Sequence, residues 1–171
     1  MLVSLKWLKD YVDIDLKAEK LAERLTMSGL EVESVKEIHP EFTGVVTAKI
    51  ISVNSHPNAD KLSLCEVTDG SKKYRVVCGA KNIKTGDVVP LARVGATIPG
   101  GYTIKSSVLR GETSDGMLCS EAELAIGEDA SGIMQLPRNM KLGKPLEKAL
   151  DLDDTVFDLS LIHISEPTRP Y

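Results

Sequence analysis

Hydrophobic and polar residues alternate along the central part of this 171-residue chain. Alternation with a period of two places successive side chains on opposite faces of a strand, and it is clearest at 62–68 and 73–78. The run 45–53 is rich in β-branched residues, which favour strands. Together with two shorter runs, the pattern predicts strands at 45–53, 62–68, 73–78, 88–92 and 102–105.

Turn-forming residues separate these runs. Asp69-Gly70 predicts a hairpin turn, and Pro99-Gly100 interrupts the chain before the last run. Five short strands joined by such turns within residues 41–148 are typical of a small closed sheet. We therefore expect a mainly β fold, with a five-stranded barrel of the OB type. Another small barrel or a sandwich would satisfy the same spacing.

The segment before the strands has a helical pattern. Ser4 can cap one short helix and Asp15 a second, because apolar residues recur after each at the spacing of one helical face. Gly29 suits the left-handed position that ends a helix, and residues 30–34 alternate like a half-buried strand. This pattern predicts a small α+β unit beside the barrel.

Helical signals return after the strands. Ser120 and Glu123 have the spacing of a capping box, which predicts a short helix ending near Gly127. Residues 146–152 predict a last helical turn.

The distribution of charge along the chain excludes some classes of function. The chain has a net charge of −4, which excludes a uniformly basic nucleic-acid binder. Residues 41–148 hold 14 Lys and Arg against 12 Asp and Glu, so the predicted barrel is the net-basic part of the chain. No apolar run approaches the roughly 18 residues of a membrane span, and the first residues do not form a signal peptide. We expect no membrane partner and a cytoplasmic location.

No catalytic or metal-binding constellation emerges from the residue pattern. The sequence contains no phosphate-binding glycine loop and no zinc-hydrolase motif. Cys65, Cys78 and Cys119 form no CxxC pair, and we expect Cys65 and Cys78 to fill small apolar positions on strands. The expected catalytic and metal residues are therefore none, and no cofactor is expected in this chain.

A basic cluster offers a binding surface instead. Lys72, Lys73 and Arg75 lie on or beside a predicted strand, and Lys81 and Lys84 follow in the next loop. Alternation places Lys73 and Arg75 on one face of the strand. Barrels of the OB type often bind oligonucleotides with such a surface, although a basic strand is more often only a solvated face. Because aromatic residues make up only 4% of the chain, contact with the RNA backbone fits better than base stacking.

Four stretches of the central segment carry recognisable motifs. They are His56-Pro57-Asn58-Ala59-Asp60-Lys61-Leu62, Val77-Cys78-Gly79-Ala80-Lys81-Asn82, Leu109-Arg110-Gly111 and Ser114-Asp115-Gly116-Met117-Leu118-Cys119-Ser120-Glu121. In this order they resemble the tRNA-binding OB-fold domain. That family includes appended domains of aminoacyl-tRNA synthetases and stand-alone tRNA-binding proteins.

The flanking segments extend the resemblance. Residues 1–12, 29–33 and 155–160 are similar to the start of bacterial phenylalanine–tRNA ligase β subunits. The resemblance implies an OB-type barrel (41–148) inserted into an α+β N-terminal domain that is incomplete here. Residues 1–40 would be the first half of that domain, and residues 149–160 would begin the second half.

This resemblance also implies partners and chemistry. The parent enzyme would be an α2β2 assembly that uses ATP and Mg²⁺ to join phenylalanine to its tRNA. The partners of this chain would then be tRNA and the α subunit, and the chain alone would be inactive. A stand-alone tRNA-binding protein and a purely structural subunit-interface domain are the alternatives.

Two sets of residues are the candidates for tRNA contact. We expect backbone contacts from the basic residues Lys72, Lys73, Arg75, Lys81, Lys84 and Arg110. Motif positions that we expect in loops beside this surface are Asn58, Lys61, Asn82, Ser120 and Glu121.

The sequence departs from the family pattern in two places. Ala125 stands where the family usually has glycine, which can alter a turn. Residues 161–171 do not continue the pattern, and we expect them to be a tail foreign to the native chain.

Overall fold

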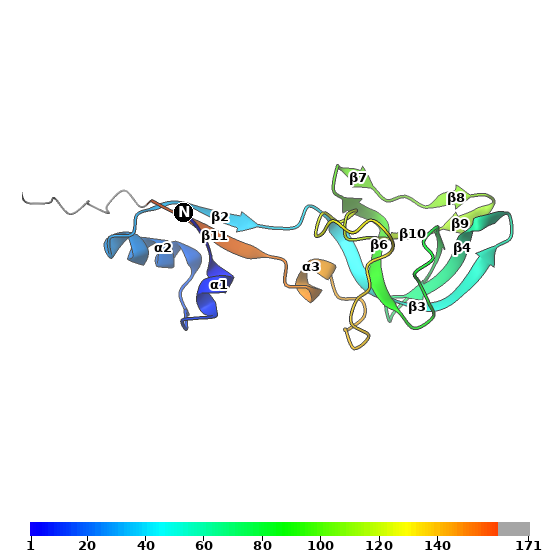
Figure 1. Ribbon diagram of the computed structural model, residues 1–171, viewed down its shortest axis with the longest axis horizontal. Coiled ribbons are helices and arrows are strands. Elements are labelled where there is room, and N and C mark those ends of the chain that lie inside the picture. Colours follow the sequence, from blue (N-terminus) through cyan, green and yellow to red (C-terminus); the bar gives the residue numbers. More distant parts are fainter. Residues whose placement is uncertain (161–171) are drawn as a thin grey trace, which may run out of the picture. The chain divides into compact units, whose positions relative to one another are not determined.

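The computed structural model of the chain describes residues 1–160 (Figure 1). Two compact units share these residues. Unit 1 combines residues 1–39 with the segment from Leu152 onward, and unit 2 is Pro40–Asp151. The expected foreign tail at 161–171 lies outside the described residues.

Unit 2 is built from antiparallel strands (Figure 1). Its main sheet has the order β10-β6-β3-β4-β5, and β7 also pairs with β6. A separate two-stranded ladder joins β8 to β9. The strands are β3 (Thr43–His56), β4 (Ala59–Thr68), β5 (Lys73–Cys78), β6 (Val88–Ile98), β7 (Tyr102–Thr103), β8 (Ser107–Leu109), β9 (Glu112–Ser114) and β10 (Gly116–Leu118). The mainly β fold is therefore confirmed.

Strand β3 holds this sheet together because it pairs with two partners. Its first half is antiparallel to β6, from Thr43 to Lys49. Its second half is antiparallel to β4, from Lys49 to His56. Register shifts interrupt both ladders, as expected where a strand bends. One continuous strand thus links the two halves of the sheet.

The core of unit 2 lies on the inward face of these strands. Alternating residues of β3, such as Val46, Ala48 and Ile50, are almost fully buried, as are Val67 on β4 and Val76 on β5. The period-two pattern of the sequence is the cause, because it puts every second side chain on the same face. Burying apolar area at about 25 cal/mol per Å² makes this core the main source of stability in the unit.

The sheet does not close into the expected five-stranded barrel. Its path has ends at β10 and β5, and no ladder joins these two strands within residues 1–160. Two isolated hydrogen bonds connect β5 to the residues before β10. Asp115 N donates to Arg75 O at 2.8 Å, and Val77 N donates to Ser114 Oγ at 3.1 Å. The sequence pattern also missed β8, β9 and β10, because three-residue strands are too short for alternation to be detected.

Unit 1 is a three-stranded antiparallel sheet with the order β1-β11-β2. Val3, Phe157 and Leu159 form its buried core, against which apolar side chains of the helices pack. Neither helix buries a residue fully. The elements are β1 (Leu2–Ser4), α1 (Leu5–Lys9), α2 (Ala18–Met27), β2 (Val32–Ile38) and β11 (Asp154–Leu159).

Local signals set the helix ends in unit 1. Ser4 caps α1 as expected, since its Oγ accepts a hydrogen bond from Trp7 N at 3.1 Å. Gly29 has a φ of 96° and ends α2 in a Schellman motif, in which Leu30 N bonds Leu25 O at 2.9 Å. The expected cap at Asp15 is wrong, because α2 begins after Lys17 and has no side-chain cap. No helix within residues 1–160 is long and apolar enough to cross a membrane.

The capping box at Ser120 forms without the helix that it predicts. Ser120 N donates to Glu123 Oε2 at 2.7 Å, and Glu123 N donates to Ser120 Oγ at 3.2 Å. The chain then makes turns instead of a helix, and Ala125 adopts a left-handed φ of 52°. A left-handed residue cannot continue an α-helix. The last helical turn does form, as α3 (Leu146–Ala149).

Replacing Ala125 by glycine should stabilise unit 2. A left-handed alanine costs about 1–2 kcal/mol, and the greater flexibility of unfolded glycine offsets roughly half of this. We expect the free energy of unfolding to rise by about 0.5–1 kcal/mol in Ala125→Gly, as measured by chemical denaturation. Ala122→Gly, a nearby exposed position without positive φ, is the control and should not stabilise. An equal gain in both variants would contradict this explanation.

Candidate nucleic-acid interface

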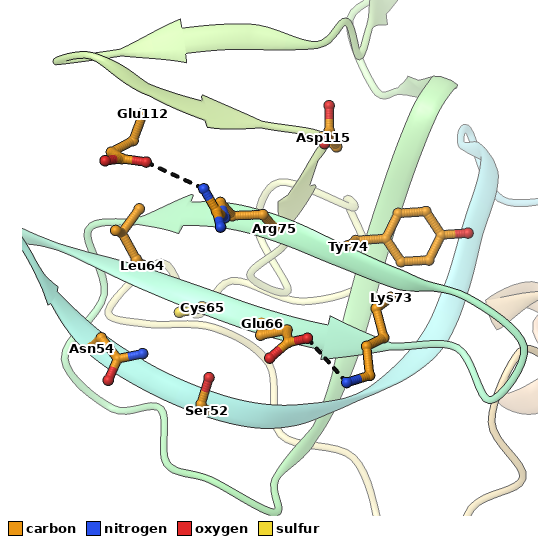
Figure 2. A pocket seen from close by; sticks show the side chains of 10 residues that line it. All are labelled: Ser52, Asn54, Leu64, Cys65, Glu66, Lys73, Tyr74, Arg75, Glu112 and Asp115. Carbon is orange, nitrogen blue, oxygen red and sulfur yellow. Dashed lines mark hydrogen bonds and ion pairs between the residues drawn. The ribbon is translucent and has the colours of Figure 1, made fainter.

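A groove runs over the outward face of β3, β4 and β5 (Figure 2). Its volume is about 580 Å³. Ser52 and Asn54 of β3 and Glu66 of β4 line one part, while Lys73 and Arg75 of β5 line another. Both basic side chains are exposed and Val76 is buried, which confirms the expected alternation along β5.

The two basic residues of the groove are already paired with carboxylates. Lys73 Nζ lies 3.2 Å from Glu66 Oε1, and Arg75 Nη1 lies 3.5 Å from Glu112 Oε2 (Figure 2). Asp115 adds a third carboxylate to the lining. The groove therefore has one more negative than positive side chain. Exposed ion pairs are worth only about 0–1 kcal/mol, so a phosphate can compete for the cations, but the groove has no excess of positive charge.

The turn before β5 is organised by a buried aspartate. Asp69 Oδ1 accepts hydrogen bonds from Ser71 N at 3.0 Å and Lys72 N at 2.8 Å. Asp69 Oδ2 accepts one from the Tyr74 hydroxyl at 2.8 Å and lies 3.9 Å from Arg93 Nη1. Burial opposes ionisation of this carboxyl, but the hydrogen bonds prevail and hold its pKa well below the usual range. The Lys72 ammonium lies 5.4 Å from the centre of the Tyr74 ring, a cation–π contact.

A hydrogen-bonded clamp joins the β3–β4 turn to the β8–β9 turn. The buried ring of His56 accepts a bond at Nδ1 from Asn58 N (3.1 Å), and its Nε2 lies 3.1 Å from Leu109 O. Since a carbonyl only accepts, Nε2 is the donor of this contact. Asn58 Nδ2 donates to Arg110 O at 3.0 Å. Arg110 and Gly111 form the hairpin turn with φ values of 54° and 94°.

Lys61 and Lys81 lie at the same end of unit 2 as this clamp. Lys61 follows the β3–β4 turn by a few residues on β4. The last residue of β5, Cys78, is paired with Ser63, so the chain leaves β5 beside the start of β4 and reaches Lys81. Both side chains are exposed, as is Arg110. None of these three cations forms an ion pair within the described part of the chain.

Three of the expected contact residues form hydrogen bonds within unit 2. Asn82 Nδ2 donates to Ile133 O at 2.8 Å, and Asn82 Oδ1 accepts from Ile133 N at 3.0 Å. Ser120 is buried and bonded to Glu123, and the main-chain oxygen of Glu121 accepts a hydrogen bond from Ile126 N. These contacts hold the loops around β5 in place.

Lys84 lies apart from the other basic residues. Its main-chain N donates to Asp87 Oδ2 at 2.9 Å, in the turn that precedes β6. The other oxygen of Asp87 pairs with Arg138 at 3.1 Å. Gly86 N bonds Ile50 O, which places this turn beside the middle of β3 and away from the His56 clamp.

The three cysteines of the chain lie in its interior. Cys65, Cys78 and Cys119 are buried and free, and burial raises the pKa of the Cys65 and Cys119 thiols to about 12. Cys65 and Cys78 pack in the core, as expected. Within residues 1–160, no group of three or more His, Cys, Asp or Glu side chains could hold a metal ion.

Sequence reasoning missed two features of this site. The clamp by His56 was not foreseen, because its partner Leu109 lies 53 residues away along the chain. The pairing of Arg75 with Glu112 was also missed, since it requires the β8–β9 hairpin. Glu66 could have been found, because the register of β4 and β5 places it opposite Arg75.

The family of the chain follows from its match to known proteins. Residues 45–145 match the family model described as "Putative tRNA binding domain". This match covers more than half of the chain and all four motif stretches. The chain therefore belongs to this family of tRNA-binding domains.

Individual relatives extend the similarity to unit 1. The phenylalanine–tRNA ligase β subunit of Syntrophus aciditrophicus is 63% identical over 161 residues, and that of Syntrophotalea carbinolica is 47% identical over 170 residues. These matches cover 94% and 99% of this chain but 20% and 21% of the relatives. The chain thus spans about a fifth of the length of these curated relatives.

A solved structure is more distantly similar. The structure titled "Crystal Structure of C-terminal Domain of Plasmodium vivax p43" aligns with a TM-score of 0.42 and 21% identity. The alignment covers 59% of this chain and 57% of that one, and the likeness is too remote to define the fold.

The Asp69 network makes a pH-dependent contribution to stability. Because the folded-state pKa of Asp69 is depressed, its stabilisation is present above about pH 4 and is lost as pH falls further. The Asp69→Asn substitution keeps one side-chain oxygen that can accept hydrogen bonds, but it removes the negative charge. We expect the free energy of unfolding to fall by about 1–3 kcal/mol at pH 7, and by less at pH 3. Chemical denaturation at both pH values measures this.

Asp60→Asn is the matched control for Asp69→Asn, because Asp60 is exposed and lies in the same unit. Its free energy of unfolding should stay within about 0.5 kcal/mol of the original protein. A deficit in Asp69→Asn that is the same at pH 7 and pH 3 would show that the charge of Asp69 is not stabilising.

Proposed function

We propose that this chain is part of a phenylalanine–tRNA ligase β subunit, acting in the cytoplasm, and that its unit 2 binds tRNA. The match of residues 45–145 to the tRNA-binding family carries this proposal. The relatives named as phenylalanine–tRNA ligase β subunits support the choice of enzyme, since they match unit 1 as well as unit 2.

In this proposal, residues 41–148 form an OB-type tRNA-binding domain inserted into a second domain. The hydrogen bonds from Asp115 N to Arg75 O and from Val77 N to Ser114 Oγ support a barrel, because they link β5, one end of the open sheet, to the residues that directly precede β10 at the other end. Residues 1–40 and 149–160 would belong to the two halves of the N-terminal domain. Their joint sheet, in which β11 pairs with both β1 and β2, supports this. Residues 161–171 would be a foreign tail.

The tRNA-binding surface would come from basic and polar residues of unit 2. Exposed cations can pair with phosphates and release the counterions of the RNA, so the affinity depends strongly on salt. The contacts would come from a set of candidate residues, which includes cations with and without ion-pair partners. The candidates are Lys72, Lys73, Arg75, Lys81, Lys84, Arg110, Asn58, Lys61, Asn82, Ser120 and Glu121.

The ligase chemistry would take place outside this chain. An α2β2 assembly with the α subunit would bind ATP and Mg²⁺ and join phenylalanine to tRNA, and this chain alone would be inactive. The carboxylates of unit 2 fit this division, because those of Glu66, Asp69 and Glu112 are used in ion pairs and hydrogen bonds within the unit.

A purely structural role at a subunit interface is the second candidate. The net-negative lining of the β5 groove favours it, as do the internal bonds of Asn82 and Ser120. A stand-alone tRNA-binding protein is less consistent with the relatives, whose similarity includes unit 1.

Binding of the full chain to a transcript of tRNAPhe tests the proposal. We expect binding at about 50 mM salt, with an affinity that falls as salt rises and a logarithmic slope of roughly −0.7 to −0.9 for each phosphate contacted. Filter binding between about 50 and 200 mM salt measures both quantities. A single-stranded DNA of the same length, which lacks the folded tRNA shape, is the control and should bind more weakly. Absence of tRNA binding at the lowest salt would leave the structural role.

A further inference from the structure

We propose that the RNA backbone binds at the end of unit 2 that carries Lys61, Lys81 and Arg110, and not in the groove over β5. In this arrangement His56 and Asn58 are positioning residues that hold Arg110 toward the RNA. The inference rests on the proposed function and names the surface that performs it. We call this surface the turn end, and it comprises the β3–β4 turn, the β8–β9 turn and the chain that leaves β5.

Three connections far apart in the sequence meet at the turn end. The side chain of Asn58, in the β3–β4 turn, bonds the main chain of Arg110 in the β8–β9 turn. The pairing of Cys78 with Ser63 brings the chain after β5 beside the same end of β4. A Cβ placed on Gly79 would lie 3.6 Å from Leu62, which shows how closely these segments approach. The cations on the three connections therefore share one end of the sheet.

Charge distinguishes the turn end from the groove. Lys61, Lys81 and Arg110 are exposed and have no ion-pair partner within residues 1–160. The carboxylates along these segments are Asp60 and Glu112, so the three cations remain in excess. Phosphate binding at these cations breaks no existing ion pair.

In the groove, by contrast, a phosphate could bind only by breaking existing ion pairs. Lys73 and Arg75 would have to exchange Glu66 and Glu112 for the phosphate, and both carboxylates would remain beside it. Like charges at such short range repel and offset the gain. The groove over β5 is therefore the poorer phosphate site, despite its volume of about 580 Å³.

The clamp fixes the backbone of the turn at Arg110. A left-handed φ is unfavourable for arginine by about 1–2 kcal/mol, so the turn needs support from its surroundings. The bonds from His56 to Leu109 O and from Asn58 to Arg110 O provide it on either side of the turn. A Cβ on Gly111 would approach Asn58 Nδ2 to 3.4 Å, so the two turns also pack tightly. Holding an arginine in place before binding reduces the entropy lost on contact with RNA.

Two charge-matched double variants of the full chain test this surface. Lys61→Gln with Arg110→Gln removes one lysine and one arginine from the turn end, and Lys73→Gln with Arg75→Gln removes the same charges from the groove. We expect the first pair to lower the affinity for tRNAPhe at least about tenfold at 0.1 M salt and to reduce the salt slope by roughly 1.4–1.8. The second pair should stay within about twofold of the original affinity.

The results distinguish an error in the proposed binding surface from an error in the proposed function. If the original chain binds tRNAPhe and the groove pair weakens binding as much as the turn-end pair, the location is wrong while tRNA binding stands. If the original chain does not bind, both proposals fail. Thermal melting of each variant shows whether a loss of affinity reflects unfolding.

A double-mutant cycle tests the positioning role of Asn58. Asn58→Ala should weaken tRNA binding in the original chain, but should add little in the Arg110→Gln background, because Asn58 acts through Arg110. A role in stability alone would give the same loss of affinity in both backgrounds and would overturn the positioning role. Lys73→Gln provides the control background, in which Asn58→Ala should keep its full effect.

Discussion

Strand β3 is the constraint on which the architecture of unit 2 depends. It pairs with β6 through its first half and with β4 through its second half, so both halves of the sheet are built on one strand. The buried side chains of Val46, Ala48 and Ile50 fix its inward face, because a slip by one residue would move them to the other face of the strand, which Val45 and Thr47 occupy. His56, the last residue of β3, contacts the β8–β9 turn through a hydrogen bond to Leu109 O.

The pairing of charges decides what this scaffold can bind. The groove over β5 collects basic residues, but the neighbouring strand β4 carries Glu66, and the β8–β9 hairpin carries Glu112. The turn end has three cations against two in the groove lining, and its cations have no ion-pair partner within residues 1–160. If RNA binds as we propose, a count of lysines and arginines along the sequence overstates the attraction of the groove for RNA and understates that of the turn end.

Local patterns in the sequence predicted those elements of the fold that depend on interactions between residues close together in the chain. The strands around Val46 and Val76, the cap at Ser4 and the helix end at Gly29 follow from alternation and from backbone preference. The helix expected after Ser120 did not form, because a left-handed residue interrupts it. The β8–β9 hairpin, the open edge of the sheet and the partners of each cation depend on contacts between distant segments, which no local pattern encodes. Motifs in the sequence were enough to propose candidate contact residues. They could not show which of these side chains are exposed and without a partner inside the protein.

Mapping the contact surface by NMR tests the central claim most directly. On addition of tRNAPhe to the isotopically labelled chain, we expect the largest changes in backbone amide signals at residues 56–62, 79–82 and 109–112. Signals of Lys73, Tyr74 and Arg75, in the middle of the groove lining, should change little. The largest changes at these three residues, or changes spread evenly over unit 2, would contradict the account.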